Sequence, residues 1–451
     1  MLTWAKRPWR CGCADGHSEI VRLERLGTVD RLNLAIEIPG HPMNMGAVAL
    51  VDAADLLDGD GCLPLAALRE RISTRLPKVP RLRQVVKSSR TLSGRPLWRD
   101  DPGFRIGYHI NRIKLAPPAD EQGLLRLAAD LMSTVLDRRH PLWRMWFITG
   151  IAGGQAAVIL VLHHVVADGL GAMKLLTALF GNSSVPQMSL ARDTARPRTR
   201  RIIEALTGAV ETFRHSRKAP RTTFNRPVGT SRSLAVLRLD LATAKQVAHH
   251  HGGKVNDVVL AMAAAALRDL MLARGELTGQ VCLHAAVAVS LRDGGDLATA
   301  AGNRTGGYVV HLPISISDSA TRLRLISADS AYAKRTQSPV AGNMFLVLLA
   351  RLGLIRRLSR RQRFTNLVES NIAGPAGPIS LLGVPVRELI PIGVLAGNLS
   401  IAFLALSYAG CLVITVQADT DLFDDLTLIT DAAQREWDAL RRIVRVPTKA
   451  M

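Results

Sequence analysis

The chain has 451 residues, 48% of them hydrophobic, which is more than one core of ordinary size holds, so we expect two domains. No stretch of about eighteen residues is continuously apolar, so the sequence predicts no membrane-spanning helix. The basic N-terminus is not followed by an apolar segment, which argues against a secretory signal and makes the cytoplasm the default location.

The formal net charge of +21 predicts an anionic partner. Only 4% of the residues are aromatic, which leaves few platforms for stacking bases, and no zinc-finger or RNA-binding signature is present, so we do not expect nucleic acid. Anionic lipid head groups or the phosphates of coenzyme A (CoA) explain the charge better. The five cysteines are an odd number with no clustered histidines, so neither a disulfide framework nor a metal site is expected.

Residues 1–24 are expected to be a disordered extension. Residues 25–182 mix strand-like and helix-like runs and are expected to form a first α/β domain. The segments 147–149 and 156–162 flank a glycine-rich turn and predict a hairpin. The remaining expected elements of this domain are a strand at 45–51 and helices at 63–76, 124–136 and 170–180.

Residues 183–233 are rich in arginine and proline and are interpreted as a basic crossover linker with one helix at 200–215, or as a segment that docks on a membrane or on CoA phosphates. Residues 234–451 are expected to form the second domain. Its helix at 255–273 is the strongest prediction, with Asn256 as a possible cap. Its other expected elements are strands at 234–239, 281–289, 307–312, 399–405 and 411–418 and a helix at 431–444.

The segment 344–364 begins with apolar residues and then places arginines on one helical face, opposite leucine and isoleucine. A basic amphipathic helix of this kind can lie in a lipid interface. The alternative is a surface helix whose leucines pack on its own domain. Either interpretation is compatible with the sequence.

The most informative segment is the apolar run Ala156–Leu162, which is typical of a buried strand and is followed directly by His163 and His164. An imidazole takes up and returns a proton near neutral pH, as a general base must. Asp168 and Gly169 follow as a turn before the next helix. A histidine pair alone is more often structural than catalytic, but the whole pattern His-His-x-x-x-Asp-Gly is far more specific.

This pattern resembles the signature of the CoA-dependent acyltransferase superfamily, in which the second histidine is the base. Further segments in order make the chain similar to the bacterial wax ester synthase/diacylglycerol acyltransferase family over about residues 25 to 440. These segments include Pro141-Leu142-Trp143, Asn256-Asp257, Val289-Ser290-Leu291-Arg292, Gly302-Asn303-Arg304 and Ser370-Asn371-Ile372-Ala373-Gly374-Pro375.

The resemblance implies two chloramphenicol-acetyltransferase-like α/β domains with a tunnel between them. It implies His164 as general base, His163 in a supporting role, and Asp168 as a structural residue paired with Arg292. The remaining residues expected to bind substrate or support the site are Gly169, Pro141, Leu142, Trp143, Asn256, Asp257 and Asn303. The segment 141–143 is interpreted either as a wall of the acyl channel or as core packing.

Two departures from the family pattern concern packing: the opening Ser-x-x-Asp is reduced to Thr28-Val29-Asp30, and one proline is lost after Asn371. The expected reaction is transfer of a long-chain acyl group from acyl-CoA, as substrate and not cofactor, to diacylglycerol. Alternatives are a long-chain alcohol as acceptor, a carrier-protein thioester as donor, or a non-catalytic lipid-binding protein. We expect the protein to contact the inner face of the plasma membrane or lipid droplets peripherally. Neither acceptor identity, acyl chain length nor oligomeric state follows from the sequence.

Overall fold

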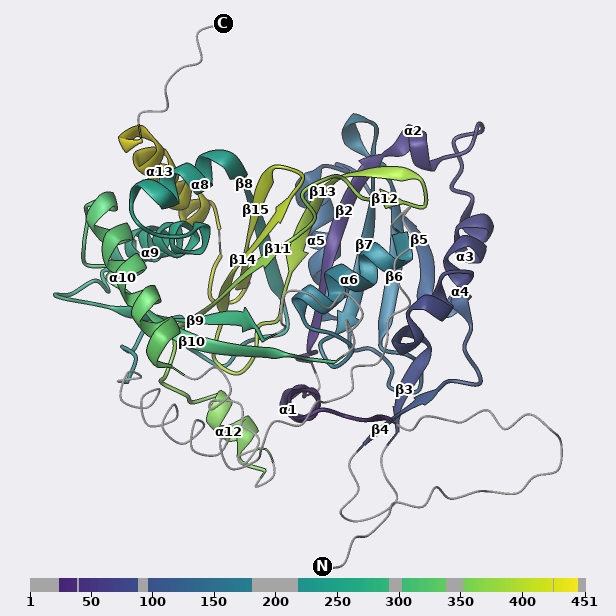
Figure 1. The fold of residues 1–451 in the computed structure, drawn as a ribbon, viewed down its shortest axis with the longest axis horizontal. Helices are drawn as coiled ribbons and strands as arrows, with labels where there is room; N and C mark the ends of the chain where they lie inside the picture. The colour runs from purple at the N-terminus through teal and green to yellow at the C-terminus, as the bar shows by residue number, and fades with distance from the viewer. Residues whose placement is uncertain are drawn as a thin grey trace, which may run out of the picture.

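The fold is described from a computed structural model that covers residues 24–38, 40–87, 96–180, 218–291, 302–337, 350, 353–424 and 426–444. Two six-stranded sheets form the centre of the molecule, and helices flank them (Figure 1). Helices α8, α9, α10 and α13 of the second half lie at the left of that view and α2, α3 and α4 of the first half lie at the right, while α1 and α12 lie below the sheets.

The first sheet has the order β12-β13-β2-β7-β6-β5. Its strands from the first half are β2 (Asn44–Asp52), β5 (Ile110–Lys114), β6 (Trp143–Ile151) and β7 (Gln155–His163). The expected hairpin between β6 and β7 is confirmed: the strands are antiparallel, and Gly153 and Gly154 in the connection have φ of 76° and 70°, which favours glycine. The hairpin therefore positions the end of β7, where the histidine pair lies.

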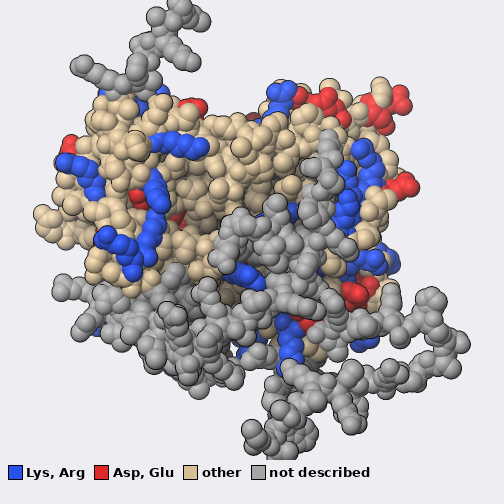
Figure 2. Space-filling view, viewed as in Figure 1, with Lys and Arg blue, Asp and Glu red and all other residues tan. Residues whose placement is uncertain are grey.

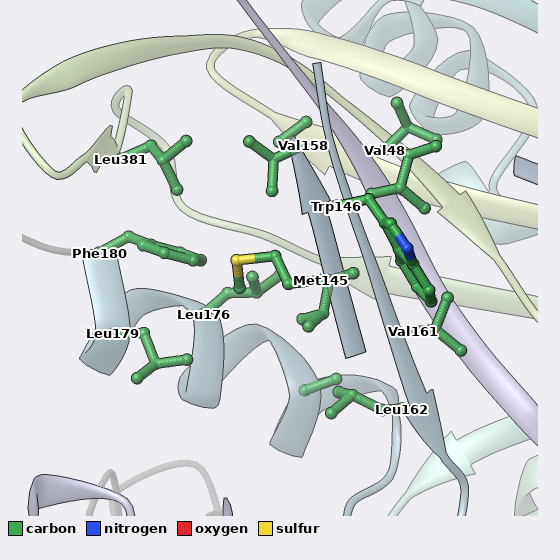
Figure 3. Packing of buried hydrophobic residues seen from close by; sticks show 14 of the residues in the cluster. Val48, Met145, Trp146, Val158, Val161, Leu162, Leu176, Leu179, Phe180 and Leu381 are labelled. Carbon is green, nitrogen blue, oxygen red and sulfur yellow. The ribbon is translucent and has the colours of Figure 1, made fainter. Parts of the chain in front are cut away.

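Helix α6 (Gly169–Phe180) covers one face of the first sheet. Figure 3 shows its side chains Leu176, Leu179 and Phe180 on this face, whereas Val48 and Trp146 lie on the other. Since strand side chains alternate between faces, a continuously apolar strand such as β7 is buried on both of them. The core thus explains the unbroken apolar run before the histidines.

The first half also contains a small three-stranded sheet and short helices around the main sheet. The small sheet consists of β1 (Glu24–Arg25), β3 (Gln84–Lys87) and β4 (Leu97–Asp100). The helices are α1 (Thr28–Ile36), α2 (Ala53–Leu56), α3 (Leu65–Ser73), α4 (Ile106–His109) and α5 (Glu121–Ser133).

The second sheet has the order β10-β9-β11-β14-β15-β8. Its strands are β8 (Arg232–Asp240), β9 (Leu283–Ser290), β10 (Thr305–Leu312), β11 (Leu367–Ala373), β14 (Ile401–Tyr408) and β15 (Cys411–Asp419). The helices of this half are α8 (Leu241–His250), α9 (Val255–Ala273), α10 (Ser319–Thr336), α12 (Ile355–Ser359) and α13 (Thr427–Ile443).

Helix α9 has the expected bounds, but Asn256 does not cap it. The helix starts after Lys254, and the Asp257 carboxylate accepts a hydrogen bond from the Lys254 backbone N–H at 2.8 Å. Asn256 is the second helical residue, one step too far along the helix to serve as N-cap. The prediction that Asn256 caps the helix is therefore wrong, because Asn256 lies inside the first turn. The side chain that bonds to the backbone at the start of the helix is that of Asp257, which accepts from the Lys254 N–H.

Two strands of the second half belong to the first sheet. Residues Val384–Ile392 form β13, which pairs antiparallel with β2, and the two-residue β12 (Ser380–Leu381) extends that edge. Dividing the chain at residue 234 does not foresee this excursion, because alternation of apolar residues predicts a strand without indicating its partner.

Residues 1–23, the linker helix expected at 200–215, and Arg292 lie outside the described residues. The apolar start of the segment 344–364, residues 344–349, also lies outside the described residues. The described part of this segment contains α12. In the described ranges, no helix is long and apolar enough to cross a membrane. On the face shown in Figure 2, lysine and arginine side chains are visible over the left-hand helices, near α3 and α4, and in smaller groups between them.

Candidate active site

His164 follows β7 directly, at the junction of the two halves. Its backbone N–H donates to the Met43 carbonyl at 2.7 Å, and its half-buried ring lines a cavity of about 290 Å³. Residues of both halves line this cavity, among them Met45, Leu160 and Met173 from the first and Val368, Ser370 and Leu406 from the second. The imidazole therefore faces an apolar space built by both halves.

Asn303, from the loop before β10, fixes the orientation of the His164 ring. The Asn303 amide nitrogen Nδ2 donates to Asp30 Oδ1 at 2.7 Å and to the His164 carbonyl at 2.6 Å. These two acceptors turn the amide oxygen Oδ1 toward His164 Nδ1, 2.9 Å away. Because an amide oxygen only accepts, Nδ1 carries the proton and Nε2 is left with its lone pair.

A second amide, Asn33 on α1, lies on the other side of the same ring. Its Nδ2 is 3.2 Å from His164 Nδ1 and 3.3 Å from the His164 carbonyl. With the proton on Nδ1, the carbonyl is the group that can accept from Asn33. Among the described residues, nothing bonds to Nε2, so this atom is available to a substrate.

The surroundings of His164 favour the neutral ring. Burial is the largest influence and lowers the pKa of His164 below its ordinary value of 6.5, while the hydrogen bond that Nδ1–H donates to Asn303 Oδ1 acts in the opposite direction. A neutral imidazole with a free Nε2 is the form that a general base requires.

His163 is held in the opposite tautomer. The Val165 backbone N–H donates to its Nδ1 at 2.9 Å, so its proton is on Nε2, which lies 3.1 Å from Glu37 Oε1. The ring is buried at 1% exposure and does not line the cavity. His163 therefore anchors the end of β7 and does not face the substrate space.

Glu37 is the buried counterpart of His163. Its other oxygen, Oε2, accepts from Arg138 at 2.5 Å. Burial by itself raises the pKa of Glu37, but the hydrogen bonds with His163 and Arg138 and the charge of Arg138 outweigh it and lower the pKa to about 2. Glu37 is thus ionised at neutral pH, and its carboxylate keeps the His163 ring in position.

Asp168 faces away from the base and ties the two halves together. One of its oxygens accepts from the Gly171 N–H at 2.8 Å at the start of α6, and the other from the Arg304 N–H at 2.9 Å. Beside it, Ala167 forms a β-bridge with Gly302. The side chain is fully buried. Its expected pairing with Arg292 stays a prediction, because Arg292 is outside the described residues.

Gly169 lines the cavity at the first position of α6. A Cβ built at this position would lie 2.5 Å from Ile372 Cδ1 of the opposite half. The glycine therefore allows the two halves to approach closely at the site.

The segment 141–143 does not line the cavity next to His164. Trp143 is fully buried, stacks on His109 at 4.4 Å between ring centroids, and donates its indole N–H to the Leu82 carbonyl at 2.8 Å. Leu142 supports the site only through its carbonyl, which accepts from the His163 N–H at 3.0 Å. The channel-wall interpretation is therefore corrected in favour of core packing.

Asn256 and Asp257 are not brought to His164. They lie at Glu369, whose pKa burial raises to about 8, with the Asp257 charge acting in the same direction. Glu369 stands between Val368 and Ser370, which line the cavity, so its side chain points to the opposite face of β11. The second sheet thus separates this polar group from the histidine.

Three polar residues of the site were not predicted from the sequence, namely Asn33, Glu37 and Ser370, whose hydroxyl lies in the cavity lining. Asn33 and Glu37 are at α1 and its end, after the reduced Thr28-Val29-Asp30 motif, and no pattern marks them. Ser370 was quoted only as part of a family segment. The retained Asp30 was a usable signal, since it accepts from both the backbone and the side chain of Asn303.

Comparison with known proteins agrees with this geometry. Residues 26–207 and 187–259 match the wax ester synthase/diacylglycerol acyltransferase catalytic domain, and residues 301–441 match the C-terminal domain of the same family. The chain is 29% identical over 435 residues to a probable diacylglycerol O-acyltransferase of Mycobacterium tuberculosis, covering 89% of this chain and 91% of that protein. It is 28% identical over 413 residues to a putative one of Mycobacterium bovis, covering 81% and 80%.

Solved structures show the same fold. The wax ester synthase/diacylglycerol acyltransferase from Marinobacter aquaeolei superposes with a TM-score of 0.71 at 23% identity, covering 93% of this chain and 99% of that one. The first condensation domain of the CDA synthetase superposes with a TM-score of 0.63 at 15% identity, covering 94% and 97%. The expected two-domain acyltransferase fold is confirmed. The chain belongs to the wax ester synthase/diacylglycerol acyltransferase family and is an O-acyltransferase.

Proposed function

We propose that this protein transfers a long-chain acyl group from acyl-CoA to the free hydroxyl of diacylglycerol, with His164 as the general base. The observation that carries the proposal is the free Nε2 of a neutral, oriented imidazole in an apolar cavity between the two halves. The names of the relatives support diacylglycerol as acceptor.

The reaction needs one proton to move twice. Nε2 takes the proton from the acceptor hydroxyl as its oxygen attacks the thioester carbonyl and forms the C–O bond. The tetrahedral intermediate then collapses, the C–S bond breaks, and the leaving thiolate of CoA receives the proton from Nε2. Nδ1 keeps its proton throughout, because Asn303 accepts from it.

The negative oxygen of the intermediate needs a donor in the cavity. Ser370 is the one hydroxyl-bearing residue among those that line it. We assign this hydroxyl as a donor to the oxyanion, and the backbone around Gly169 remains a further source. The apolar remainder of the lining suits the acyl chains and excludes the water that would hydrolyse the thioester.

The test is release of CoA thiol from palmitoyl-CoA in the presence of diacylglycerol. His164→Ala should lower kcat by about 10²- to 10⁴-fold, the usual contribution of a positioned base. His249→Ala on the exposed face of α8 is the matched control and should behave as wild type. Equal release by His164→Ala and wild type, with both folded, would exclude His164 as the base and favour a non-catalytic lipid-binding role.

The acceptor and donor alternatives are separated by the same assay. A panel of acceptors with one acyl-CoA ranks diacylglycerol against long-chain alcohols. We expect diacylglycerol to give the highest kcat/KM, and a long-chain alcohol ranking first would make the protein a wax ester synthase. Activity with a phosphopantetheinyl carrier but none with free acyl-CoA would instead indicate a condensation-type enzyme.

We further propose that the protein works at the surface of a membrane or lipid droplet, where its acceptor dissolves. The described part of the expected amphipathic segment supports this: Leu354, just before α12, is 48% exposed next to the exposed Arg356 and Arg357 of that helix. Flotation of the purified protein with anionic vesicles checks the proposal. Failure to float with vesicles of any composition would overturn it.

A further inference from the structure

The second half contains a cavity of about 300 Å³ that the proposed chemistry at His164 does not use. Four arginines line it, namely Arg221, Arg360, Arg361 and Arg363, and no acidic residue is among the lining. It lies where residues 219–225 meet the segment 360–366 that follows α12. A concave site with this concentration of guanidinium groups is built for an anion.

The floor of this arginine cavity is a rigid network of amides. Asn366 is buried at 1% exposure, and its Nδ2 donates to the Pro220 carbonyl at 3.0 Å and to Asn225 Oδ1 at 2.6 Å. Asn398, at 4% exposure, donates to the Gln362 carbonyl at 2.9 Å and accepts from Gln362 Nε2 at 2.8 Å. The backbone that carries the arginines is therefore fixed before any ligand arrives.

Among the residues that the structure describes, no carboxylate balances the charge of these arginines. Arg221, Arg360 and Arg361 are exposed, and in the described part of the chain none of them pairs with a carboxylate. Arg363 donates to the Ala219 carbonyl at 3.2 Å. Like charges kept together without acidic partners repel each other, so a bound polyanion would relieve the repulsion.

A small intermediate cavity lies between the arginine cavity and the one at His164, since it shares lining residues with both. Its volume is about 20 Å³, it shares Met43 and Ala396 with the His164 cavity, and it shares Arg360 with the arginine cavity. Ala396, Gly397 and Asn398 line the three spaces in chain order. The three spaces therefore lie in a row that leads from the arginines toward the imidazole, and the Arg360 side chain stands between the first two.

We propose that the arginine cavity binds the phosphate groups of CoA and that the pantetheine arm runs through the intermediate cavity to place the thioester at His164. This inference rests on the proposed function. The arm is a thin, unbranched chain, and its passage requires the exposed Arg360 side chain to move out of the intermediate cavity toward the phosphates. Arg360 is thereby both an obstacle in the free protein and a ligand in the complex.

The test compares donors with and without phosphates. Arg360→Ala/Arg361→Ala should raise the KM for palmitoyl-CoA about tenfold or more and change kcat by no more than about twofold, because charge-assisted bonds to phosphate are lost far from the reacting atoms. With S-palmitoyl-pantetheine, which lacks the phosphates, the variant should have a KM no higher than that of wild type, because no phosphate contact is lost and the Arg360 side chain no longer occupies the passage.

The matched control is Arg324→Ala/Arg335→Ala, which removes two exposed arginines from α10 in the same half. It should leave both KM values unchanged, and an equal rise in its KM for palmitoyl-CoA would show that only net charge matters and overturn the assignment. An unchanged KM for palmitoyl-CoA in Arg360→Ala/Arg361→Ala would overturn it as well. If that variant instead loses only its binding to phosphatidylglycerol vesicles, the cavity takes lipid head groups and the CoA assignment is wrong.

Calorimetric titration with CoA separates this inference from the proposed function. If wild type binds CoA about tenfold more tightly than Arg360→Ala/Arg361→Ala but shows no acyl transfer, the phosphate site stands and the proposed activity fails. If both proteins bind CoA equally while wild type is active, the activity stands and the phosphate site fails.

Discussion

Removing the Asn303 side chain tests whether the tautomer of His164 is set from the second half. Asn303→Ala deletes three contacts: those of Nδ2 with Asp30 Oδ1 and the His164 carbonyl, and that of Oδ1 with His164 Nδ1. Asp30 keeps the Asn303 and Gly27 backbone N–H donors, and the carbonyl keeps Asn33. The group that loses its acceptor is Nδ1–H of the imidazole.

The bond from Nδ1–H to Asn303 is strongest when His164 is protonated in the transition state, and losing a hydrogen bond to a charged group costs about 1.5–3 kcal/mol there. Since about 1.4 kcal/mol corresponds to a factor of ten in rate, kcat should fall roughly 10- to 100-fold. The fall should be smaller than in His164→Ala, because the imidazole remains. The hydrogen bond that His164 Nδ1–H donates to Asn303 Oδ1 raises the pKa of His164. Loss of this bond should therefore move the acid limb of the pH profile of kcat/KM to lower pH.

The assay is thiol release across pH 4 to 9 with thermal unfolding as a check on folding. Asn33→Ala is the control, since it deletes only a donor to the His164 carbonyl, and it should cost less than Asn303→Ala. A folded Asn303→Ala protein within about twofold of wild type, or an acid limb that moves to higher pH, would refute the tautomer argument.

Three further predictions concern stability. The pKa of Glu37 is lowered from 4.5 to about 2, so its ionised form contributes about 3 kcal/mol to stability above pH 4.5, and this contribution is lost as pH falls toward 2. Glu37→Gln should therefore lower the free energy of unfolding at pH 7. Urea titrations at pH 7 and 3 should show that the difference in this free energy between wild type and variant is smaller at pH 3. The pKa of Glu369 is raised from 4.5 to about 8, so the wild type loses stability as pH rises through that interval. Glu369→Gln should therefore be more stable than wild type at pH 8.5 by about 3–5 kcal/mol. An unchanged urea midpoint at this pH would contradict the raised pKa of a buried Glu369. Gly169→Ala should lower Tm and activity because its Cβ would lie 2.5 Å from Ile372 Cδ1. Adding Ile372→Val removes that atom and should restore both Tm and activity. If the second substitution does not restore them, the cause is the backbone conformation at residue 169 and not this contact.

Local patterns predicted elements well where the chain itself settles the structure. The hairpin before His163 follows from alternation and glycines, and α9 follows from its long apolar run, so their placement needed no tertiary information. The partner of β13 could not be foreseen in this way, because the pairing of Ile390 with Val48 depends on sheet assembly across more than half the chain.

The site divides along the same line. A sequence motif marks His164, Asp168 and Asn303, and the structure brings all three together. Glu37 carries no motif, since a buried carboxylate behind a histidine is defined only by three-dimensional contact. The segment at Trp143 shows the opposite error: its motif is clear, but the ring packs in the core.

Strand β13 has a consequence for how the protein can be dissected. A fragment ending at Phe180 would lack it, and residues 46–51 of β2, which pair with β13, would then present unpaired N–H and C=O groups along an apolar edge. Such a truncation should aggregate when expressed alone and become soluble when the complementary piece is supplied in the same cell. The two lobes are therefore a single cooperative folding unit, and attempts to exchange one lobe between relatives must carry residues 380–392 along with the first lobe.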